Sequence, residues 1–160
     1  MKRLLPLLIL PFTSQADAIK TDDKYAQERC LATNIYHEAR SESLAGQYAV
    51  ADVVLNRVES KRYPDTICGV VHQSQTWNGY PVRNKCQFSW YCDGKSDEPT
   101  ETNSWQQSVE VAISIIHYDK FRGITEGATH YHTHYVNPFW NRDMHLVGSI
   151  GDHIFYVEER

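Results

Sequence analysis

Glu38 is the acidic residue best placed in this sequence to transfer a proton. It follows Ile35 by three residues, on the apolar stripe of a helix predicted for residues 22–40. Burial on that stripe disfavours the carboxylate form, so the pKa of the carboxyl group rises. A glutamate with a raised pKa can act as a general acid near neutral pH. The alternative is a structural role, in which Glu38 only pairs with Arg40 or Arg57 at a helix boundary.

Two other groups of residues could bind a metal or a sugar. A predicted strand over residues 128–136 alternates strictly and places His130, His132 and His134 on one face. Imidazole is a common zinc ligand, so this face would fit a zinc-dependent amidase or peptidase. Alternating His and Tyr is also ordinary in a strand, and we expect a structural or sugar-binding face with no metal and no cofactor. In a third interpretation the chain is a non-catalytic glycan-binding module that stacks sugars on Trp77, Trp90 and Trp140.

Four helices and a small antiparallel sheet are predicted to position these groups. Ser43 is the expected N-cap of the second helix, which should form the buried centre, and Ser104 to Gln107 matches a capping box at the start of the fourth. The fold class is therefore α+β, mostly helical. The expected helices cover residues 22–40, 44–59, 64–71 and 104 to a point before Gly123; a loop spans 74–103, and strands span 128–136 and 153–157.

The N-terminus has the pattern of a secretory signal peptide. Lys2 and Arg3 precede an apolar stretch of about nine residues, which is shorter than the roughly 20 needed to cross a bilayer. Small residues around Asp17 suit cleavage after residue 18. We therefore expect a signal peptide over residues 1–18, one catalytic domain over 19–160, and a protein exported to the periplasm or the extracellular space without stable membrane insertion.

The charge of the chain argues against nucleic acid as a partner. The formal net charge is −4, and it becomes −5 once Lys2, Arg3 and Asp17 are removed with residues 1–18. No run of basic residues follows the first three positions, so the electrostatic footprint of a nucleic-acid-binding protein is missing. The length of 160 residues suits a single domain, which we expect to be a monomer.

Four cysteines are expected to form two disulfides, because an oxidising compartment favours them. Three pairings are possible from the sequence alone. Cys86 and Cys92 bracket only five residues and would close a local loop, which leaves Cys30 with Cys68. A zinc site made by all four cysteines is disfavoured because no Cys-x-x-Cys pair occurs.

An ordered series of short motifs resembles the spore cortex-lytic, SleB-type family of cell wall hydrolases. The motifs run through nearly all of the chain after the predicted signal peptide. They are Asn34-Ile-Tyr-His-Glu-Ala-Arg40, Gly46-Gln47, Ala49-Val-Ala51, Val53-Val-Leu-Asn-Arg-Val58, Tyr63-Pro64, Cys68-Gly-Val-Val71, Gln87-Phe-Ser89, Gly127-Ala-Thr-His-Tyr-His132, Val136, Pro138, Trp140 and Gly151-Asp-His-Ile-Phe-Tyr156.

This resemblance implies a lysozyme-like fold, a peptidoglycan substrate, and cleavage between N-acetylmuramic acid and N-acetylglucosamine. It also implies a single essential glutamate, which falls on Glu38. Carried over residue by residue, the candidates for the substrate groove are Gln87, Phe88, Ser89, Tyr131, His132, Trp140, His153 and Tyr156.

The chemistry of the cleavage depends on whether a second carboxylate is present. Ordinary glycosidases place a second Asp or Glu across the scissile bond. Asp52, Asp93 and Asp143 are available, but none lies in a segment that marks it as the partner. A lytic transglycosylase needs only one glutamate, because a hydroxyl of the muramic residue closes a 1,6-anhydro ring. We therefore favour transglycosylation and keep simple hydrolysis by a muramidase as the alternative.

Overall fold

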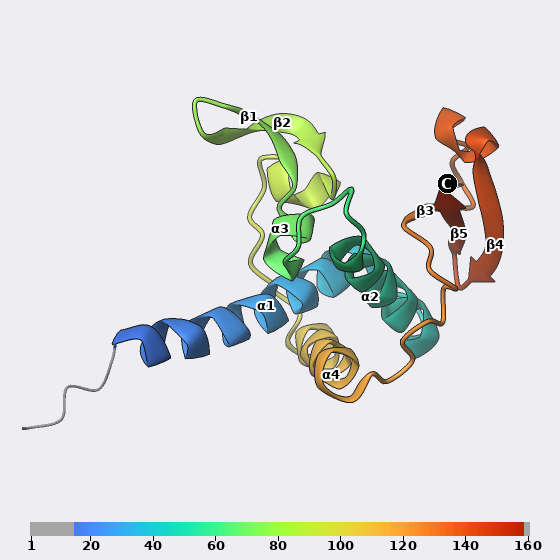
Figure 1. Ribbon diagram of the computed structural model, residues 1–160. Coiled ribbons are helices and arrows are strands. Elements are labelled where there is room, and N and C mark those ends of the chain that lie inside the picture. Colours follow the sequence, from blue (N-terminus) through green and yellow to red (C-terminus); the bar gives the residue numbers. More distant parts are fainter. Residues whose placement is uncertain (1–14, 159–160) are drawn as a thin grey trace, which may run out of the picture.

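The computed structural model describes residues 15–158, and for residues 15–24 only the backbone. Residues 1–14 of the predicted signal peptide lie outside this part, and residues 15–18 are the first residues of helix α1. Helices and short 3-10 turns alternate with two small sheets (Figure 1). The elements are α1 (Gln15–Ala39), α2 (Leu44–Glu59), α3 (Ile67–Val71), β1 (Ser74–Trp77), β2 (Tyr80–Cys86), η1 (Ser89–Cys92), α4 (Thr102–Tyr118), β3 (His130–Thr133), η2 (Phe139–Asp143), β4 (Met144–Ile150) and β5 (His153–Glu158).

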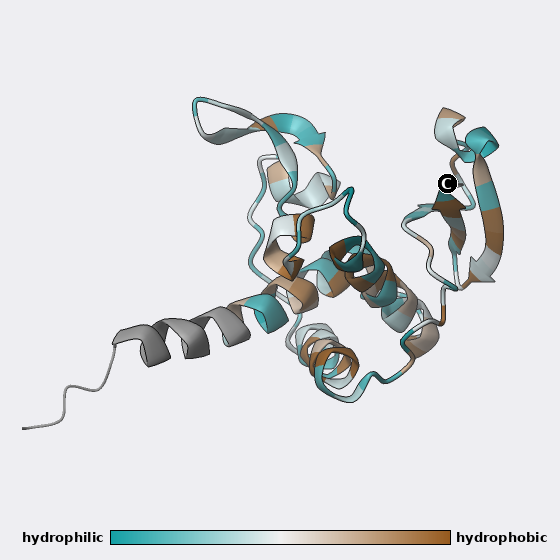
Figure 2. Cartoon of the chain, in the orientation of Figure 1, coloured by the Kyte–Doolittle hydropathy of each residue, from teal (hydrophilic) through white to brown (hydrophobic). Residues whose placement is uncertain are grey.

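Helix α2 forms the centre of the molecule, as its apolar spacing predicts. Val50, Val53 and Val54 are fully buried. One side of α2 packs with α1, α3 and α4 in the main core, and the other side packs against the three-stranded sheet through Val53 and Phe155. Brown apolar residues mark α2 and α4 in Figure 2. The helix that carries Glu38 therefore shares its core with the buried helix α2.

The N-cap predicted for α2 is confirmed, and the capping box predicted for α4 is not. The Ser43 hydroxyl accepts a hydrogen bond from the Gly46 N–H at 3.3 Å, and α2 begins at the next residue as predicted. Thr66 caps α3 in the same way. The predicted capping box is wrong, because α4 begins at Thr102 and Ser104 lies inside it, where its hydroxyl donates to Glu101 instead.

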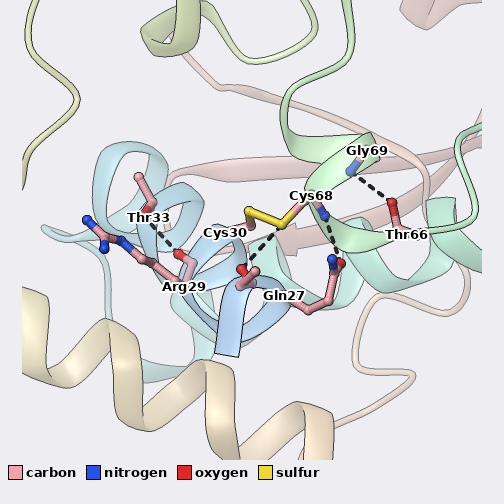
Figure 3. The surroundings of a disulfide bond; sticks show 8 residues. Gln27, Arg29, Cys30, Thr33, Thr66, Cys68 and Gly69 are labelled. Carbon is pink, nitrogen blue, oxygen red and sulfur yellow. Dashed lines mark hydrogen bonds between the residues drawn. A yellow bond between two sulfur atoms is a disulfide. The ribbon is translucent and has the colours of Figure 1, made fainter. Parts of the chain in front are cut away.

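Two disulfides tie the helical part together, in the pairing that the short spacing favours. Cys30 of α1 is bonded to Cys68 of α3, and Cys86 is bonded to Cys92. Figure 3 shows the first of them, where the Cys68 N–H also donates to the Gln27 side chain of α1 at 3.0 Å. The disulfide and this hydrogen bond hold α3 against α1 two turns before Glu38.

The segment predicted as a loop over residues 74–103 contains a β-hairpin instead. Strands β1 and β2 pair across a two-residue turn, where Asn78 and Gly79 have φ of 49° and 82°. Positive φ at both central positions is the geometry that Asn-Gly favours in a hairpin. The Asn-Gly dipeptide is therefore the sequence signal for this element, although exposed polar residues hide the alternation around it.

The second sheet has the order β3-β5-β4, with every pair antiparallel. The predicted pairing of the strand near residue 130 with the strand at 153–157 is confirmed, but β3 ends at Thr133 instead of residue 136. A turn begins there, and the Val136 N–H donates to the Thr133 carbonyl. Strand β4 was not expected, because its residues are mostly partly exposed and do not alternate.

Candidate active site

Glu38 lies in the last turn of α1, where the helix meets the three-stranded sheet. Ile35 and Ala39 on either side of it are buried, so its side chain emerges beside the core and is itself only partly exposed. The Tyr131 hydroxyl, which comes from β3, donates a hydrogen bond to Glu38 Oε2 at 3.0 Å. The end of helix α1 and strand β3 therefore both position the Glu38 carboxyl group.

The surroundings of Glu38 favour its protonated form. Burial raises the pKa of its carboxyl group, and the Tyr131 hydrogen bond and the charges of Arg57 and His37 only partly oppose that effect. Burial and the neighbouring Glu38 also raise the pKa of the Tyr131 hydroxyl well above its usual range, so Tyr131 remains a proton donor. A carboxyl group with a raised pKa and one fixed hydrogen bond has the properties of a general acid.

Arg57 is a buried cation beside this carboxyl group. It is 5% exposed, and its Nε–H donates to the Thr129 carbonyl at 2.7 Å. Its guanidinium carbon lies 5.3 Å from the ring centres of both Tyr63 and Phe88, in the range of cation–π contacts. Within residues 15–158, Arg57 Nη1 has no hydrogen-bond partner. A buried polar group without a partner is rare, so this guanidinium group beside Glu38 is a candidate site residue.

The structural alternative for Glu38 is an ion pair with Arg40 or Arg57, and neither pair forms in the part of the chain that the structure describes. Arg40 instead bonds to Glu101 at 3.3 Å. Arg57 acts on Glu38 only as a nearby charge. Arg57 is therefore not an ion-pair partner of Glu38, and its burial beside that carboxyl group makes it a candidate site residue.

Five of the eight groove candidates gather on the Glu38 side of the sheet or next to it. Tyr131 and His153 share one face, because Tyr131 is opposite Phe155 and Thr133 is opposite His153 in the register. Phe88 is buried against Arg57, and its neighbours Gln87 and Ser89 are exposed. These two polar residues are therefore accessible to solvent next to the buried Phe88.

The other three candidates form an aromatic cluster on the opposite face of the sheet. The rings of His132 and Tyr156 are stacked at 5.3 Å, and Trp140 meets both at 5.6 Å. Side chains on alternate residues of a strand point to opposite faces, so His132 cannot point toward Glu38 together with Tyr131. The structure thus divides the predicted groove residues between two faces.

The three histidines of the metal alternative do not come together. His132 Nδ1 donates to the Thr133 carbonyl, which leaves its Nε2 as the acceptor for the Tyr156 hydroxyl at 3.0 Å. His134 lies beyond the end of β3, next to Asp152. Over residues 15–158, no group of three or more His, Cys, Asp or Glu side chains is arranged to hold a metal ion.

The three tryptophans of the glycan-binding alternative have different surroundings. Trp90 is buried, and its indole N–H donates to the Asn34 side chain at 3.1 Å. Trp140 is partly buried in the aromatic cluster, whereas Trp77 is 74% exposed near the tip of the β1–β2 hairpin. They do not line one surface, which weakens the interpretation of the chain as a stacking platform.

Two of the three candidate second carboxylates are hydrogen-bonded to other groups, and the third is exposed to solvent. Asp52 is fully buried and accepts hydrogen bonds from Gly123, Thr125 and Arg122, which fixes the segment after α4. Asp93 accepts from the Lys95 N–H at 2.8 Å. Asp143 is exposed at the end of η2.

Residues 41–156 match the profile of the family described as Cell Wall Hydrolase. The chain belongs to this family. The matched region includes Arg57, Tyr131 and His153 and begins three residues after Glu38. No helix within residues 15–158 is long and apolar enough to span a membrane.

Curated relatives of this cell wall hydrolase are named spore cortex-lytic enzymes. The protein of Oceanobacillus iheyensis is 36% identical over 67 residues, which is 41% of this chain and 24% of that protein. The protein of Bacillus subtilis is 44% identical over 45 residues, which is 28% of this chain and 15% of that protein. The aligned parts thus span a quarter or less of these relatives.

Solved structures confirm the fold. The catalytic domain of the Bacillus cereus SleB protein matches with a TM-score of 0.61 at 24% identity, over 83% of this chain and 91% of that one. The catalytic domain of the germination-specific lytic transglycosylase SleB of Bacillus anthracis matches with a TM-score of 0.61 at 27% identity, over 82% and 93%. The expected α+β, lysozyme-like fold and the resemblance to the SleB type are both confirmed.

Proposed function

We propose that this cell wall hydrolase is a lytic transglycosylase that cuts peptidoglycan strands between N-acetylmuramic acid and N-acetylglucosamine, with Glu38 as its catalytic acid. The observation that carries the proposal is the Glu38 carboxyl group, whose burial raises its pKa and which Tyr131 holds by one hydrogen bond. The name of the Bacillus anthracis neighbour, a lytic transglycosylase, supports the same reaction class.

In the first step, protonated Glu38 gives its proton to the glycosidic oxygen, and the bond between that oxygen and the anomeric carbon of the muramic residue breaks. The N-acetylglucosamine unit leaves with a free hydroxyl group. Glu38 is now a carboxylate and accepts the proton of the C6 hydroxyl of the muramic residue, while the C6 oxygen attacks the anomeric carbon. The product is a 1,6-anhydromuramic end, Glu38 is protonated again, and no water is consumed.

The same site supports transglycosylation over hydrolysis, because hydrolysis with two carboxylates requires a partner that none of the candidates supplies. Asp52 is buried in its own hydrogen-bond network, and Asp93 is bound to a nearby backbone N–H. A single glutamate that acts first as acid and then as base needs no such partner. Hydrolysis remains the alternative that the products distinguish.

The substrate would lie along the surface where the exposed Gln87 and Ser89 flank the buried Phe88. The buried guanidinium group of Arg57 would act as a positive charge beside Glu38. We further propose that residues 1–18 are removed on export and that the catalytic domain of residues 19–160 acts as a monomer on the wall outside the cytoplasm.

Mass analysis of digested peptidoglycan tests this function. Purified cell walls are incubated with the protein of residues 19–160, and the soluble muropeptides are analysed before and after borohydride reduction. We expect muropeptides that end in 1,6-anhydromuramic acid and are not reduced. Reducible muramic ends as the main product would assign hydrolysis, and free stem peptides would assign an amidase or peptidase.

A further inference from the structure

The Glu42 side chain lies in a recess next to two glycines, Gly46 and Gly151. A Cβ atom at position 46 would lie 2.9 Å from the Glu42 Cβ, and a Cβ at position 151 would overlap its carboxylate. Glycine occupies both positions, one in the first turn of α2 and one in the turn between β4 and β5. At Gly151, φ is 59°, so this turn also requires the left-handed conformation that glycine adopts most easily.

The recess also binds the Glu42 carboxylate. Oε2 accepts a hydrogen bond from the Asp152 N–H at 3.1 Å, which ties the end of α1 to the sheet. The side chain is only 13% exposed, although no lysine or arginine pairs with it among residues 15–158. Oε1 faces Nδ1 of His153 at 3.8 Å, about 1 Å beyond a hydrogen bond.

His153 is a buried imidazole with an unsatisfied nitrogen. It is 4% exposed, and its Nδ1 has no hydrogen-bond partner within the described residues 15–158. Burial lowers the pKa of His153, so the ring is neutral near neutral pH. A buried polar atom without a partner is rare and calls for an explanation, and the Glu42 carboxylate is the acceptor that lies 3.8 Å from this nitrogen.

The His153 ring connects this pair to the general acid. It meets the Tyr131 ring edge to face, with centres 5.0 Å apart and planes at 86°. Such T-shaped contacts are preferred between aromatic rings and fix their relative orientation. The Tyr131 hydroxyl then donates to Glu38, so side chains in contact lead from Glu42 to Glu38.

We propose that Glu42 and His153 form a positioning pair for the general acid: Glu42 orients His153, and the His153 ring holds Tyr131 with its hydroxyl directed at Glu38. This inference rests on the proposed function, because it assigns a role around Glu38. Neither residue of the pair has to touch the substrate. A purely structural role for Glu42 would instead affect stability and leave the chemistry of Glu38 unchanged.

A double-variant cycle tests the pair. Rates of solubilisation of purified glycan strands are measured for the wild type, Glu42→Gln, Tyr131→Phe and the protein with both changes. We expect Glu42→Gln to lower kcat by about 10- to 100-fold with little change in KM, since a misplacement of about 1 Å costs that much. The protein with both changes should be no slower than the slower single variant, because both changes act through one contact.

The pH dependence of kcat gives a second readout that a structural role would not move. The groups facing Glu38 are Tyr131, Arg57 and His37, and only the Tyr131 hydrogen bond changes in Glu42→Gln. That bond lowers the pKa of Glu38, so its weakening raises this pKa and moves the alkaline limb of the profile to higher pH. The titratable groups near His153 are Glu42, Asp152 and His132. A change at any of them would shift the alkaline limb of the pH–rate profile only through the position of Tyr131.

The matched control is Glu28→Gln. Glu28 also lies on α1, has a side chain that is 15% exposed, and contacts a histidine, with 2.5 Å between Glu28 Oε1 and His117 Nε2. It is ten residues before Glu38, about 15 Å along the helix. We expect this variant to keep the wild-type rate and pH profile.

Three results would contradict the proposal that Glu42 and His153 position the general acid. They are losses that add in the double variant, an alkaline limb that does not move, and a loss of rate that a lower melting temperature explains. If Glu42→Gln does not fold, His153→Gln replaces it in the same cycle, and failure of both to fold would assign the pair to stability and reject the proposal. The proposed function fails separately, if Glu38→Gln stays active or the wild type releases no anhydro ends.

Discussion

Replacing Glu38 by glutamine separates catalysis from packing at this position. Glutamine keeps the shape of the side chain, and its carbonyl oxygen can still accept from the Tyr131 hydroxyl, which lies 3.0 Å from Glu38 Oε2. It cannot give a proton to the glycosidic oxygen. Loss of that step costs about 10²- to 10⁴-fold in rate, or about 3 to 5 kcal/mol in the activation barrier. We expect the loss in kcat.

Although Glu38→Gln should lose activity, its free energy of unfolding relative to the wild type should increase as the pH rises. A hydrogen bond from Tyr131 to a neutral acceptor is weaker than one to a carboxylate, by about 1 kcal/mol. Burial raises the pKa of Glu38 in the folded protein, so its contribution to stability is full at low pH and is lost as the pH rises through that pKa. Glu38→Gln has no such loss, so its stability relative to the wild type should increase with pH.

The assay compares clearing of purified cell-wall suspensions by the wild type, Glu38→Gln and the control Glu28→Gln, after matching melting curves. A well-folded Glu38→Gln protein that keeps more than about a tenth of the wild-type rate would show that Glu38 is not the catalytic acid, because the acid step should cost at least the lower end of its range. An equal loss of activity in Glu28→Gln would also contradict this assignment.

Three further predictions concern the neighbour of the acid, the disulfides and metal ions. Tyr131→Phe should move the alkaline limb of the pH–rate profile to higher pH, because its hydrogen bond lowers the pKa of Glu38; an unchanged limb would contradict this. Removing the Cys30–Cys68 disulfide, with a sequence separation of 38, should lower the free energy of unfolding by about 4 kcal/mol, against about 2 kcal/mol for Cys86–Cys92, with a separation of 6; urea titration checks the order. Activity should survive EDTA, and a loss that zinc restores would favour the metal alternative.

The sequence predicts best those elements whose side chains repeat with a clear period. Helix α2 begins and ends where its valines and the Ser43 cap indicate. Its residues are buried on nearly all sides of the helix, so its apolar pattern is clear in the sequence. Strand β5 is predicted for a similar reason. The hairpin and β4 are missed because their residues are largely exposed, so no alternation between polar and apolar side chains marks them.

The residues of the candidate site also differ in how far the sequence alone indicates them. The position of Glu38 at the buried end of α1 can be predicted, because its apolar stripe and its motif lie within one helix, and its catalytic role stays a prediction. Arg57 and Glu42 cannot be assigned a role from their segments, since their importance comes from residues far along the chain, such as the Thr129 carbonyl and the Asp152 N–H. The division of the groove candidates between two sheet faces follows from strand register, which resemblance to a motif does not contain.

The disulfide between α1 and α3 makes the stability of the protein depend on the redox state of its surroundings. Cys30 and Glu38 lie on the same helix, eight residues apart, so the bond that anchors α3 also steadies the helix that carries the acid. The two disulfides together contribute about 6 kcal/mol, comparable with the whole stability of a small domain of about 5 to 15 kcal/mol. If the chain is exported as proposed, it is marginally stable while its thiols are reduced and becomes a durable enzyme only after they are oxidised. Wall cleavage would then begin only after the disulfides have formed outside the cytoplasm.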